Sequence, residues 1–345
     1  MLVSINDAIS LRGSSGTARV IQLIEGALHD LGMMVERLAP RAPGPHKIVN
    51  ALRSTAWDLR EFDRRAAGNV LISPTNVGLA LSGRPHLLWV HDTMVLDHPG
   101  WFDKAYAAHA RLTFGPSVLR ATAVCTPSHN ARERLVRRWP GIAAKVHVVP
   151  WPAHGNPQVP RRVKSAELTV VMLGATEPHK RHTLGIEAVR LLRLVSGEDV
   201  RLLVIGPAGR ADADVVRRLR LVDPRRQWTR RVTLPDRAAV DAQLRTSWLL
   251  LQCSLDEGFC LPLVESAAHA VPAVHTGAGS MAEVHPPGDC RSDQARILAQ
   301  RMLELLDDTR YAEASAAAVD VAVRHSSDIF RSRLDVLLQR LVQCA

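Results

Sequence analysis

Two glutamates in the second half of the chain, Glu257 and Glu265, are separated by seven residues in the segment EGFCLPLVE. The apolar run WLLLQCS before them predicts a buried strand, and the residues from Leu261 onward predict a helix. A carboxylate on such a loop can stabilise positive charge at a reacting carbon, while backbone amides at the helix start can contact an anion. Alternatively, Glu257 caps the helix and Glu265 is solvated. The spacing alone leaves both interpretations open.

A possible partner for this chemistry is Lys180, in the segment VVMLGATEPHKRHTLGIEAVRLL that begins at Val170. The pattern predicts a buried strand, a polar turn and a helix. A cation on this turn could neutralise the charge that grows on a diphosphate leaving group. The competing interpretation is a solvated lysine at a helix start.

The first half of the chain offers weaker signals. His91 and Asp92 follow an apolar run that predicts a strand, but a lone histidine there is more often structural, and Asp92 could simply cap a turn. The loop RGSSGTARV from Arg12 contains glycines that let backbone approach a phosphate or an acceptor. It has neither the dinucleotide-binding nor the P-loop spacing.

The elements that must position these residues alternate as strand and helix along the chain, which predicts an α/β fold with parallel sheets covered on both faces. One series of strands ends near Val149, a proline-rich stretch follows from Pro150, and a second series starts near Leu168. We therefore expect two doubly wound, Rossmann-like domains that face a central cleft. Parallel sheets bind ligands at the carboxyl ends of their strands. The expected boundaries are 1–155, 156–327 and a final helical segment 328–345.

The letters around the two glutamates resemble the EGFGLPxxE signature of retaining GT-B glycosyltransferases of family 4, and AVPAVHTGAGSMAEV resembles its usual continuation. The resemblance places Glu257 at the donor sugar and Glu265 at the ribose hydroxyls of the nucleotide. The amides that it assigns to sugar and phosphate belong to Gly258, Phe259, Cys260 and Leu261. Cys260 stands where the family usually has glycine, and Met281 and Ala282 replace the usual Leu-Pro.

Further positions carry the same resemblance. Lys180 matches the lysine that grips the diphosphate, His179 stands where an arginine is common, and Arg181 is a candidate helper. His91 matches a histidine at the reacting sugar, and the resemblance leaves Asp92 either an acceptor role or a structural one. The loop near the amino terminus resembles the family's GGIGRY loop, whose matching positions are Gly13, Gly16 and Arg19.

The resemblance implies a retaining hexosyltransferase. A nucleotide sugar, GDP-mannose or a UDP-sugar, would bind the second domain, and a glycan, lipid-linked or small-molecule acceptor would bind the first. Mannose is favoured as the hexose. The resemblance also implies that the final segment crosses back to the first domain. No cofactor or metal is required, because Asp212 and Asp214 are interpreted as helix-capping residues instead of a metal-binding DxD motif.

Two other classes of function share some of these features. A sugar phosphorylase or a nucleotide-sugar epimerase has the same architecture, and would show phosphate-dependent cleavage or turnover without an acceptor. A noncatalytic basic protein would bind nucleic acid or a membrane with a steep salt dependence and would show no affinity for nucleotide sugars.

Charge and composition limit the classes of binding partner that the chain is expected to have. The chain of 345 residues has 44 basic and 34 acidic residues, a formal charge of +10. The basic helical pattern Ile48–Arg65 is typical either of a helix on an anionic membrane or of a packed helix with solvated charges. Nucleic acid is an unlikely partner, since aromatic residues make up 4% and no nucleic-acid module is present.

The expected location is the cytoplasm, with a peripheral position on the inner face of the cell membrane as a further interpretation. The five cysteines are scattered, which predicts neither a disulfide framework nor a zinc site and fits a reducing compartment. The amino-terminal residues do not resemble a signal peptide, and no apolar run approaches the length of a membrane span.

Overall fold

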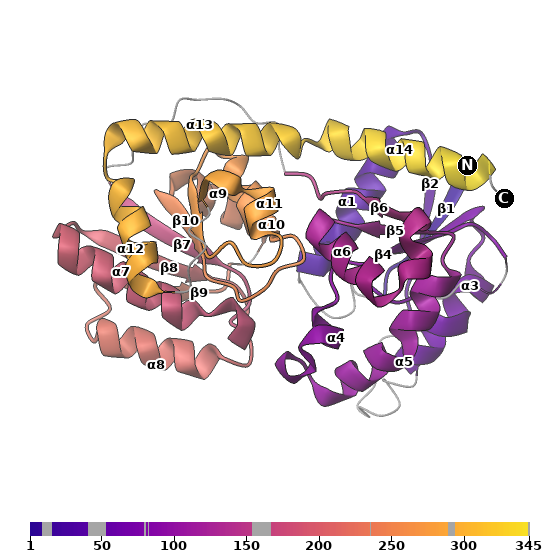
Figure 1. The fold of residues 1–345 in the computed structure, drawn as a ribbon, viewed down its shortest axis with the longest axis horizontal. Helices are drawn as coiled ribbons and strands as arrows, with labels where there is room; N and C mark the ends of the chain where they lie inside the picture. The colour runs from indigo at the N-terminus through magenta and orange to yellow at the C-terminus, as the bar shows by residue number, and fades with distance from the viewer. Residues whose placement is uncertain are drawn as a thin grey trace. The chain divides into compact units, whose positions relative to one another are not determined.

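The computed structural model describes residues 1–8, 16–40, 53–78, 81, 83–153, 167–234, 236–288 and 294–343. The chain divides into two compact units, each with its own parallel sheet (Figure 1). Unit 1 comprises Met1–Pro152 together with Ser327–Ala345, and unit 2 comprises Ala153–Ser326. The predicted α/β class with two doubly wound, Rossmann-like sheets is confirmed. Within the described ranges no helix is long and apolar enough to cross a bilayer.

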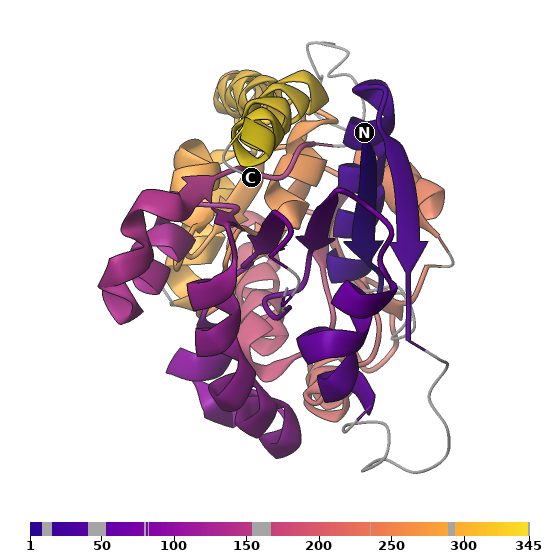
Figure 2. The same ribbon diagram turned by 90° about the vertical axis from the view of Figure 1, so that its right-hand side faces the viewer.

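Unit 1 contains a six-stranded sheet in the order β2-β1-β3-β4-β5-β6, with every neighbouring pair parallel. Figure 2 faces this unit and shows β1 and β2 side by side. The central strands are wholly buried, because helices cover both faces of a parallel sheet. The strands are β1 (Leu2–Asn6), β2 (Met34–Leu38), β3 (Val70–Ser73), β4 (His86–Trp89), β5 (Ala123–Thr126) and β6 (Val146–Val148).

The helices of unit 1 follow the strands in sequence, except for the last one, which returns from the end of the chain. They are α1 (Gly16–Asp30), a π-helical turn (Trp57–Glu61) leading into α3 (Phe62–Arg65), α4 (Met94–Asp97), α5 (Lys104–Arg120), α6 (His129–Arg138) and α14 (Ser327–Gln343). Two 3-10 helices, Pro99–Trp101 and Pro140–Lys145, complete the described set.

An aromatic cluster connects α14 to the sheet of unit 1. The rings of Trp89, on β4, and Trp151 stack at 4.7 Å between centroids. Phe330 of α14 packs against both, at 6.1 Å from Trp89 and 5.7 Å from Trp151. All three side chains are buried. Rings of this size contribute much of the buried apolar surface of a core, so α14 is an integral part of unit 1.

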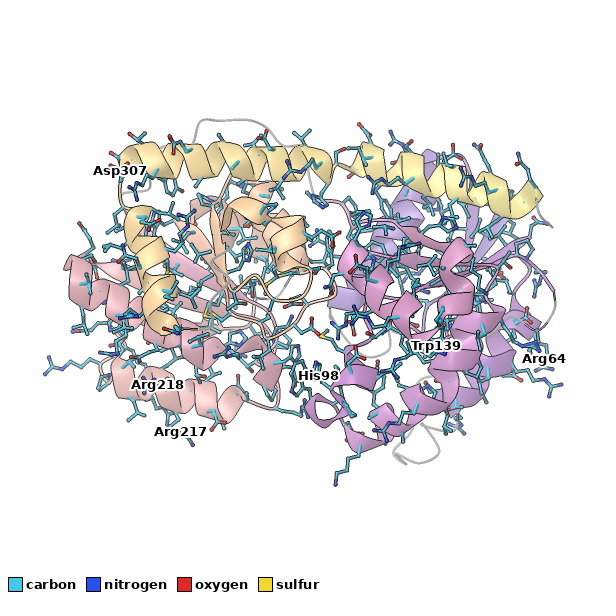
Figure 3. All side chains as sticks on the ribbon, in the orientation of Figure 1. Arg64, His98, Trp139, Arg217, Arg218 and Asp307 are labelled. Atoms are coloured by element: carbon cyan, nitrogen blue, oxygen red, sulfur yellow. The ribbon has the colours of Figure 1, made fainter. Side chains whose placement is uncertain are left out.

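The basic helical pattern predicted over Ile48–Arg65 is a packed element of unit 1. Residues 48–52 lie outside the described residues. Trp57 and Phe62 are buried in the core, while Arg64 extends into solvent at the surface (Figure 3). In the described part of this segment, residues 53–65, the large apolar side chains Trp57 and Phe62 are thus buried within unit 1, which matches the packed interpretation.

Unit 2 contains a five-stranded parallel sheet in the order β11-β10-β7-β8-β9. Its strands are β7 (Leu168–Leu173), β8 (Val200–Ile205), β9 (Thr229–Val232), β10 (Leu249–Gln252) and β11 (Ala273–His275). Its helices are α7 (His182–Ser196), α8 (Asp212–Val222), α9 (Arg237–Thr246), α10 (Leu261–Ala267), α11 (Met281–Val284), α12 (Ala295–Glu304) and α13 (Asp308–Arg324). The 3-10 helices Pro178–Lys180 and Pro286–Gly288 lie between them.

One strand lies earlier than its apolar pattern predicts. The run Val232–Leu234 indicates a strand, but β9 begins at Thr229. The cause is Asp223, whose carboxylate accepts hydrogen bonds from the amides of Gln227, Trp228 and Thr229 at 2.8 to 2.9 Å. The strand therefore begins at Thr229, the last residue bound to this carboxylate, and not at the apolar residues that follow.

Buried histidines should make the protein sensitive to acid. Burial lowers the pKa of His86, His91 and His182 to about 4, and that of His285 to about 3, from an ordinary 6.5. The unfolded chain binds protons at these sites below about pH 6.5, while the folded chain does not until about pH 4. The free energy of unfolding should therefore fall as the pH is lowered from 6.5 to 4.

Urea denaturation across this pH range measures the effect. His86→Leu should flatten the dependence, because it removes one of the groups that the folded state keeps neutral. A free energy of unfolding that stays constant from pH 6.5 to 4.5 would contradict the assignment.

Candidate active site

A lysine and a glutamate meet at the carboxyl end of the sheet in unit 2. β7 and β10 are parallel neighbours, so the loops that follow them leave the sheet at the same edge. Lys180 Nζ lies 2.5 Å from Glu257 Oε1, and the same oxygen accepts a hydrogen bond of 2.6 Å from Ser254 Oγ. The structure thus brings together two predicted site residues from 77 positions apart and adds Ser254, which the sequence analysis missed.

The turn that carries Lys180 is held by backbone contacts. The 3-10 helix Pro178–Lys180 closes with a bond from the Lys180 amide to the Glu177 carbonyl, and the His179 carbonyl accepts from the amide of Leu255. Burial and then the charge of Lys180 lower the pKa of His179. His179 therefore favours its neutral form and adds no second cation to the turn.

Arg181 occupies a left-handed backbone conformation, with φ of 50°, between the 3-10 helix and α7. This conformation costs a residue with a side chain roughly 1–2 kcal/mol and is the reason that glycine or asparagine is favoured at such joints. Its carbonyl accepts the first bonds of α7, from the amides of Leu184 and Gly185. Arg181 thus sets the direction in which α7 leaves the site.

The backbone of Glu257 is fixed from the β11 side. Ser280 donates to the Glu257 carbonyl through both its amide and its hydroxyl, each at 3.0 Å, and Thr276 Oγ1 donates to the Ser254 carbonyl at 2.7 Å. Gly279 has φ of 62°, and a Cβ there would lie 2.5 Å from the Glu257 amide nitrogen. Only glycine allows this close approach, so the GAGS segment serves to hold the glutamate.

Cys260 shows why the family signature has glycine at its position. Its φ is 70°, again left-handed, at the residue that precedes α10. The side chain is buried, and burial together with the charge of Glu257 raises the pKa of the thiol well above its usual value. The thiol is therefore protonated near neutral pH and is a packing group in this site instead of a nucleophile.

Substitutions at Cys260 should separate backbone strain from packing. Cys260→Gly relieves about 1 kcal/mol of strain and loses a similar amount of buried surface, so the free energy of unfolding should change by less than about 1 kcal/mol. Cys260→Val places a β-branched side chain at a positive φ and should cost about 2 kcal/mol or more. Chemical denaturation measures both, and equal effects would contradict the assignment.

Glu265 forms an ion pair with Arg237. Its Oε1 lies 2.9 Å from Arg237 Nη1, and the glutamate is buried while the arginine is half-buried. Arg237 begins α9, whose amino end is capped by Asp236 through a bond of 2.9 Å from the Ala239 amide. Nothing in the sequence pattern pointed to Arg237, because only the packing of α9 against α10 brings it to Glu265.

The other predicted donor residues lie in the same loop and helix start. Phe259 is buried and packs edge-on against His325, with ring centroids 5.5 Å apart, and Leu261 is the first residue of α10. Among the residues that the structure describes, the amides of Phe259, Cys260 and Leu261 donate no hydrogen bond to the protein. Gly258 lies between Glu257 and these amides, in the segment that Ser280 holds.

His91 follows β4 in unit 1 with a defined tautomer. Its pKa is lowered to about 4 by burial, so the ring is neutral near pH 7, and Nε2 lies 2.7 Å from the Pro74 carbonyl. A carbonyl can only accept, so Nε2 carries the proton and Nδ1 is an acceptor. The ring stacks on Trp151 at 5.6 Å, and the His91 amide donates to Asn76. His91 can thus receive a hydrogen bond from a hydroxyl group.

The remaining first-half positions are described by their local contacts, where the structure describes them. Asp92 Oδ1 accepts a hydrogen bond of 2.8 Å from the Met94 amide and so closes a turn before α4, whose cap residue is Thr93. Gly13 lies outside the described residues. Gly16 is the first residue of α1, and Arg19 lies half-buried in its first turn.

The interpretation of Asp212 and Asp214 as capping residues is wrong in detail. The residue at the cap position of α8 is Ala211, and it forms no side-chain cap. Asp212 Oδ1 instead accepts from Thr176 Oγ1 at 2.7 Å and pairs with Arg231 at 3.0 Å. Asp214 pairs with Arg217 at 2.7 Å. Across the described ranges, no group of three histidine, cysteine or acidic side chains is arranged to hold a metal ion.

The two Rossmann-like parallel-sheet units, the second with a lysine and a glutamate at adjacent strand ends, make up a GT-B fold. The family model described as "Glycosyl transferases group 1" matches residues 167–308, most of unit 2. Most of unit 2 is therefore similar to this family.

Solved structures share the fold over the whole length of the chain. HepE from Anabaena, in complex with UDP and glucose, has a TM-score of 0.73 and 15% identity over 99% of this chain and 100% of its own. Sucrose-phosphate synthase from Thermosynechococcus elongatus has a TM-score of 0.73 and 13% identity over 100% of both chains. WaaG, a glycosyltransferase involved in lipopolysaccharide biosynthesis, has a TM-score of 0.71 and 13% identity over 98% of both. No curated protein sequence matches the chain.

Proposed function

We propose that the enzyme transfers a hexose from a nucleoside diphosphate sugar to a hydroxyl group of a glycan, lipid-linked or small-molecule acceptor. The contact between Lys180 and Glu257 carries this proposal, because it places a cation for a diphosphate beside a carboxylate for the sugar. In the reaction, the bond from the anomeric carbon to the diphosphate breaks and a bond to the acceptor oxygen forms on the same face. The proton of the acceptor hydroxyl passes to the departing diphosphate.

The exposure of the two side chains supports these separate roles. The Lys180 side chain is 22% exposed and the Glu257 side chain 7%. An entering diphosphate can therefore reach the ammonium group and draw it away from the carboxylate. Glu257 then keeps its hydrogen bond from Ser254 and stays in place, where its charge stabilises the positive charge that develops at the anomeric carbon.

Glu265 and Arg237 support binding of the nucleoside part of the donor. The Glu265 carboxylate pairs with Arg237 through one of its oxygens, and a carboxylate can accept several hydrogen bonds at once. A ribose presents two neighbouring hydroxyl donors, which are the kind of group that a carboxylate accepts. Arg237 also fixes the orientation of the carboxylate before the donor binds.

His91 supports binding of the transferred sugar. Its neutral ring offers Nδ1 as an acceptor while Nε2 is occupied by the Pro74 carbonyl. A sugar hydroxyl is a donor of the matching kind. The interaction should stay constant from about pH 5 to 8, because the ring is neutral over that range.

Two donors are the first candidates. The segment His91-Asp92-Thr93 resembles mannosyltransferases and favours GDP-mannose, whereas HepE, with the same fold, has been crystallised with UDP-glucose. A thermal-shift panel of UDP-glucose, GDP-mannose and other nucleotide sugars should show one ligand that raises the Tm well above the others. Mass analysis of the products with that donor then identifies the hexose, and turnover without an acceptor or only with phosphate would favour an epimerase or a phosphorylase.

The acceptor and the location complete the proposal. WaaG acts in lipopolysaccharide biosynthesis, and we extend a glycan or lipid-linked acceptor to this enzyme. The proposed location is the cytoplasm, at the inner face of the cell membrane, where such acceptors are assembled. Transfer to lipid-linked acceptors in membrane extracts, compared with soluble sugars, tests this part separately from the donor.

A further inference from the structure

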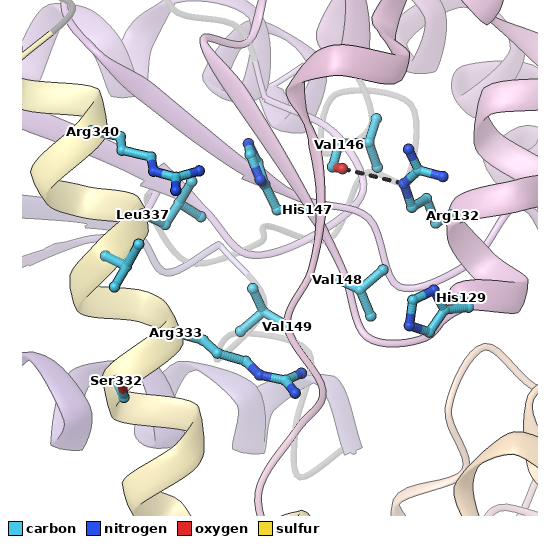
Figure 4. Close-up of a pocket in the computed structure, with 11 residues that line it drawn as sticks. His129, Arg132, Val146, His147, Val148, Val149, Ser332, Arg333, Leu337 and Arg340 are labelled. Carbon is cyan, nitrogen blue, oxygen red and sulfur yellow. Dashed lines mark hydrogen bonds between the residues drawn. The ribbon is translucent and has the colours of Figure 1, made fainter.

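A concave site lies within unit 1, remote in sequence from the proposed donor residues. It is a pocket of about 490 Å³ between α14, β6 and the amino end of α6 (Figure 4). Three arginines line it, Arg132, Arg333 and Arg340, together with His129 and His147. No acidic residue lines it, and the rest of the lining is apolar except for one serine. The pocket therefore combines positive charge with an apolar floor.

The helix α14 presents its two arginines on a single face. Arg333 and Arg340 are seven residues apart, which is two turns, and Leu337 lies between them on the same side. Figure 4 shows both guanidinium groups extending from α14 toward β6. A ligand between the helix and the strand can therefore contact both.

The opposite wall contributes a third guanidinium. Arg132 of α6 donates from Nε to the Val146 carbonyl at 3.3 Å, which holds it against β6. His147 is half-buried, and its pKa is lowered by burial and then by the charges of Arg340 and Arg132. His147 therefore lies within electrostatic range of an arginine on each wall of the pocket.

The charge of this pocket is not balanced by the protein. Within the part of the chain that the structure describes, neither Arg333 nor Arg340 forms an ion pair. Arg331, on the same helix, pairs with Asp328 at 2.7 Å and with Asp30 at 3.2 Å. Among the described residues of α14, Arg331 beside the pocket is thus neutralised by ion pairs, whereas Arg333 and Arg340 inside it are not.

We propose that this pocket binds an organic phosphate, with the phosphoryl oxygens on Arg333 and Arg340 and the carbon part on Leu337 and the valines of β6. Guanidinium groups match phosphate oxygens in geometry and charge. The volume suits a small molecule or a lipid headgroup. Both sources present the same chemistry, and experiment separates them.

Two probes test the site. Phenyl phosphate represents soluble organic phosphates, and vesicles of phosphatidylcholine with or without phosphatidic acid represent lipid headgroups. The double variant Arg333→Gln/Arg340→Gln should weaken binding of the true source by about tenfold or more, since two charge-assisted contacts are lost. Arg120→Gln, an exposed arginine of α5 outside the pocket, is the matched control and should bind as the parent does.

The ring resonance of His147 distinguishes binding in the pocket from binding elsewhere on the protein. The His147 ring resonance, assigned with His147→Gln, should shift when phenyl phosphate or a short-chain phosphatidic acid is added, and it should not shift in the double variant. Binding of phenyl phosphate identifies a soluble ligand, and binding only of phosphatidic acid identifies a lipid. The proposal is overturned if neither probe binds, or if the double variant binds as tightly as the parent. Unchanged unfolding curves of the variants exclude loss of fold.

Discussion

Glu257→Ala should reduce kcat for sugar transfer by about a hundredfold or more, because the positive charge at the anomeric carbon loses its nearest carboxylate. The same change should leave affinity for the free nucleoside diphosphate unchanged or improved. In the resting site Glu257 forms an ion pair of 2.5 Å with Lys180, and the negative charge of the glutamate also repels a diphosphate. Initial rates with the working donor and calorimetric titration with the nucleoside diphosphate measure the two effects.

The matched control is Glu187→Gln. Glu187 is an ion-paired glutamate of α7 in the same unit, bound to Arg190 at 2.6 Å, and it lies outside the proposed site. Its variant should transfer sugar at the parent rate. Transfer by Glu257→Ala at the parent rate would remove Glu257 from the reaction.

Lys180→Ala should have the opposite effect on nucleotide binding. The diphosphate loses a charge-assisted contact, so its affinity should fall by about tenfold or more, and kcat/KM for transfer should fall by about a hundredfold. The buried Glu257 carboxylate also loses its cation, which makes the site more repulsive to a diphosphate. Titration with the nucleoside diphosphate at two salt concentrations measures the loss.

Lys180→Arg supplies the control for charge. It keeps the positive charge on a differently shaped group and should retain part of the affinity. If Lys180→Ala binds the nucleoside diphosphate as the parent does, then the diphosphate binds elsewhere and the proposed donor site is wrong, whatever the effect of Glu257→Ala on rate.

The sequence predicted the presence of the strands better than the residues at which they begin. Strands such as β3 and β7 consist mostly of apolar residues, because parallel strands are buried on both faces, and this pattern is visible in the sequence. β9 was placed three residues late, since its start is set by the carboxylate of Asp223 and not by an apolar run. Local sequence patterns indicate which residues are buried, but hydrogen bonds in the preceding turn determine where a strand begins.

The site was predictable only where its residues are close in sequence or carry a family motif. Glu257 and Lys180 were found from their motifs, and the structure adds the contact between them. Arg237 carries no local signal, since its contact with Glu265 depends on how two helices pack. The left-handed backbone at Cys260 was equally hidden, because a cysteine in the sequence does not reveal a positive φ.

The return of α14 to unit 1 has a consequence for the order in which the chain folds during synthesis. Unit 2 is continuous, and all of it has been translated before Phe330 leaves the ribosome. Until then Trp89 and Trp151 lack the ring that packs against them both. Unit 2, although second in sequence, can therefore complete its core first, and unit 1 must wait with exposed aromatic surface. A chain truncated before Phe330 would therefore carry its defect in unit 1, which is built mainly from the residues before Pro152.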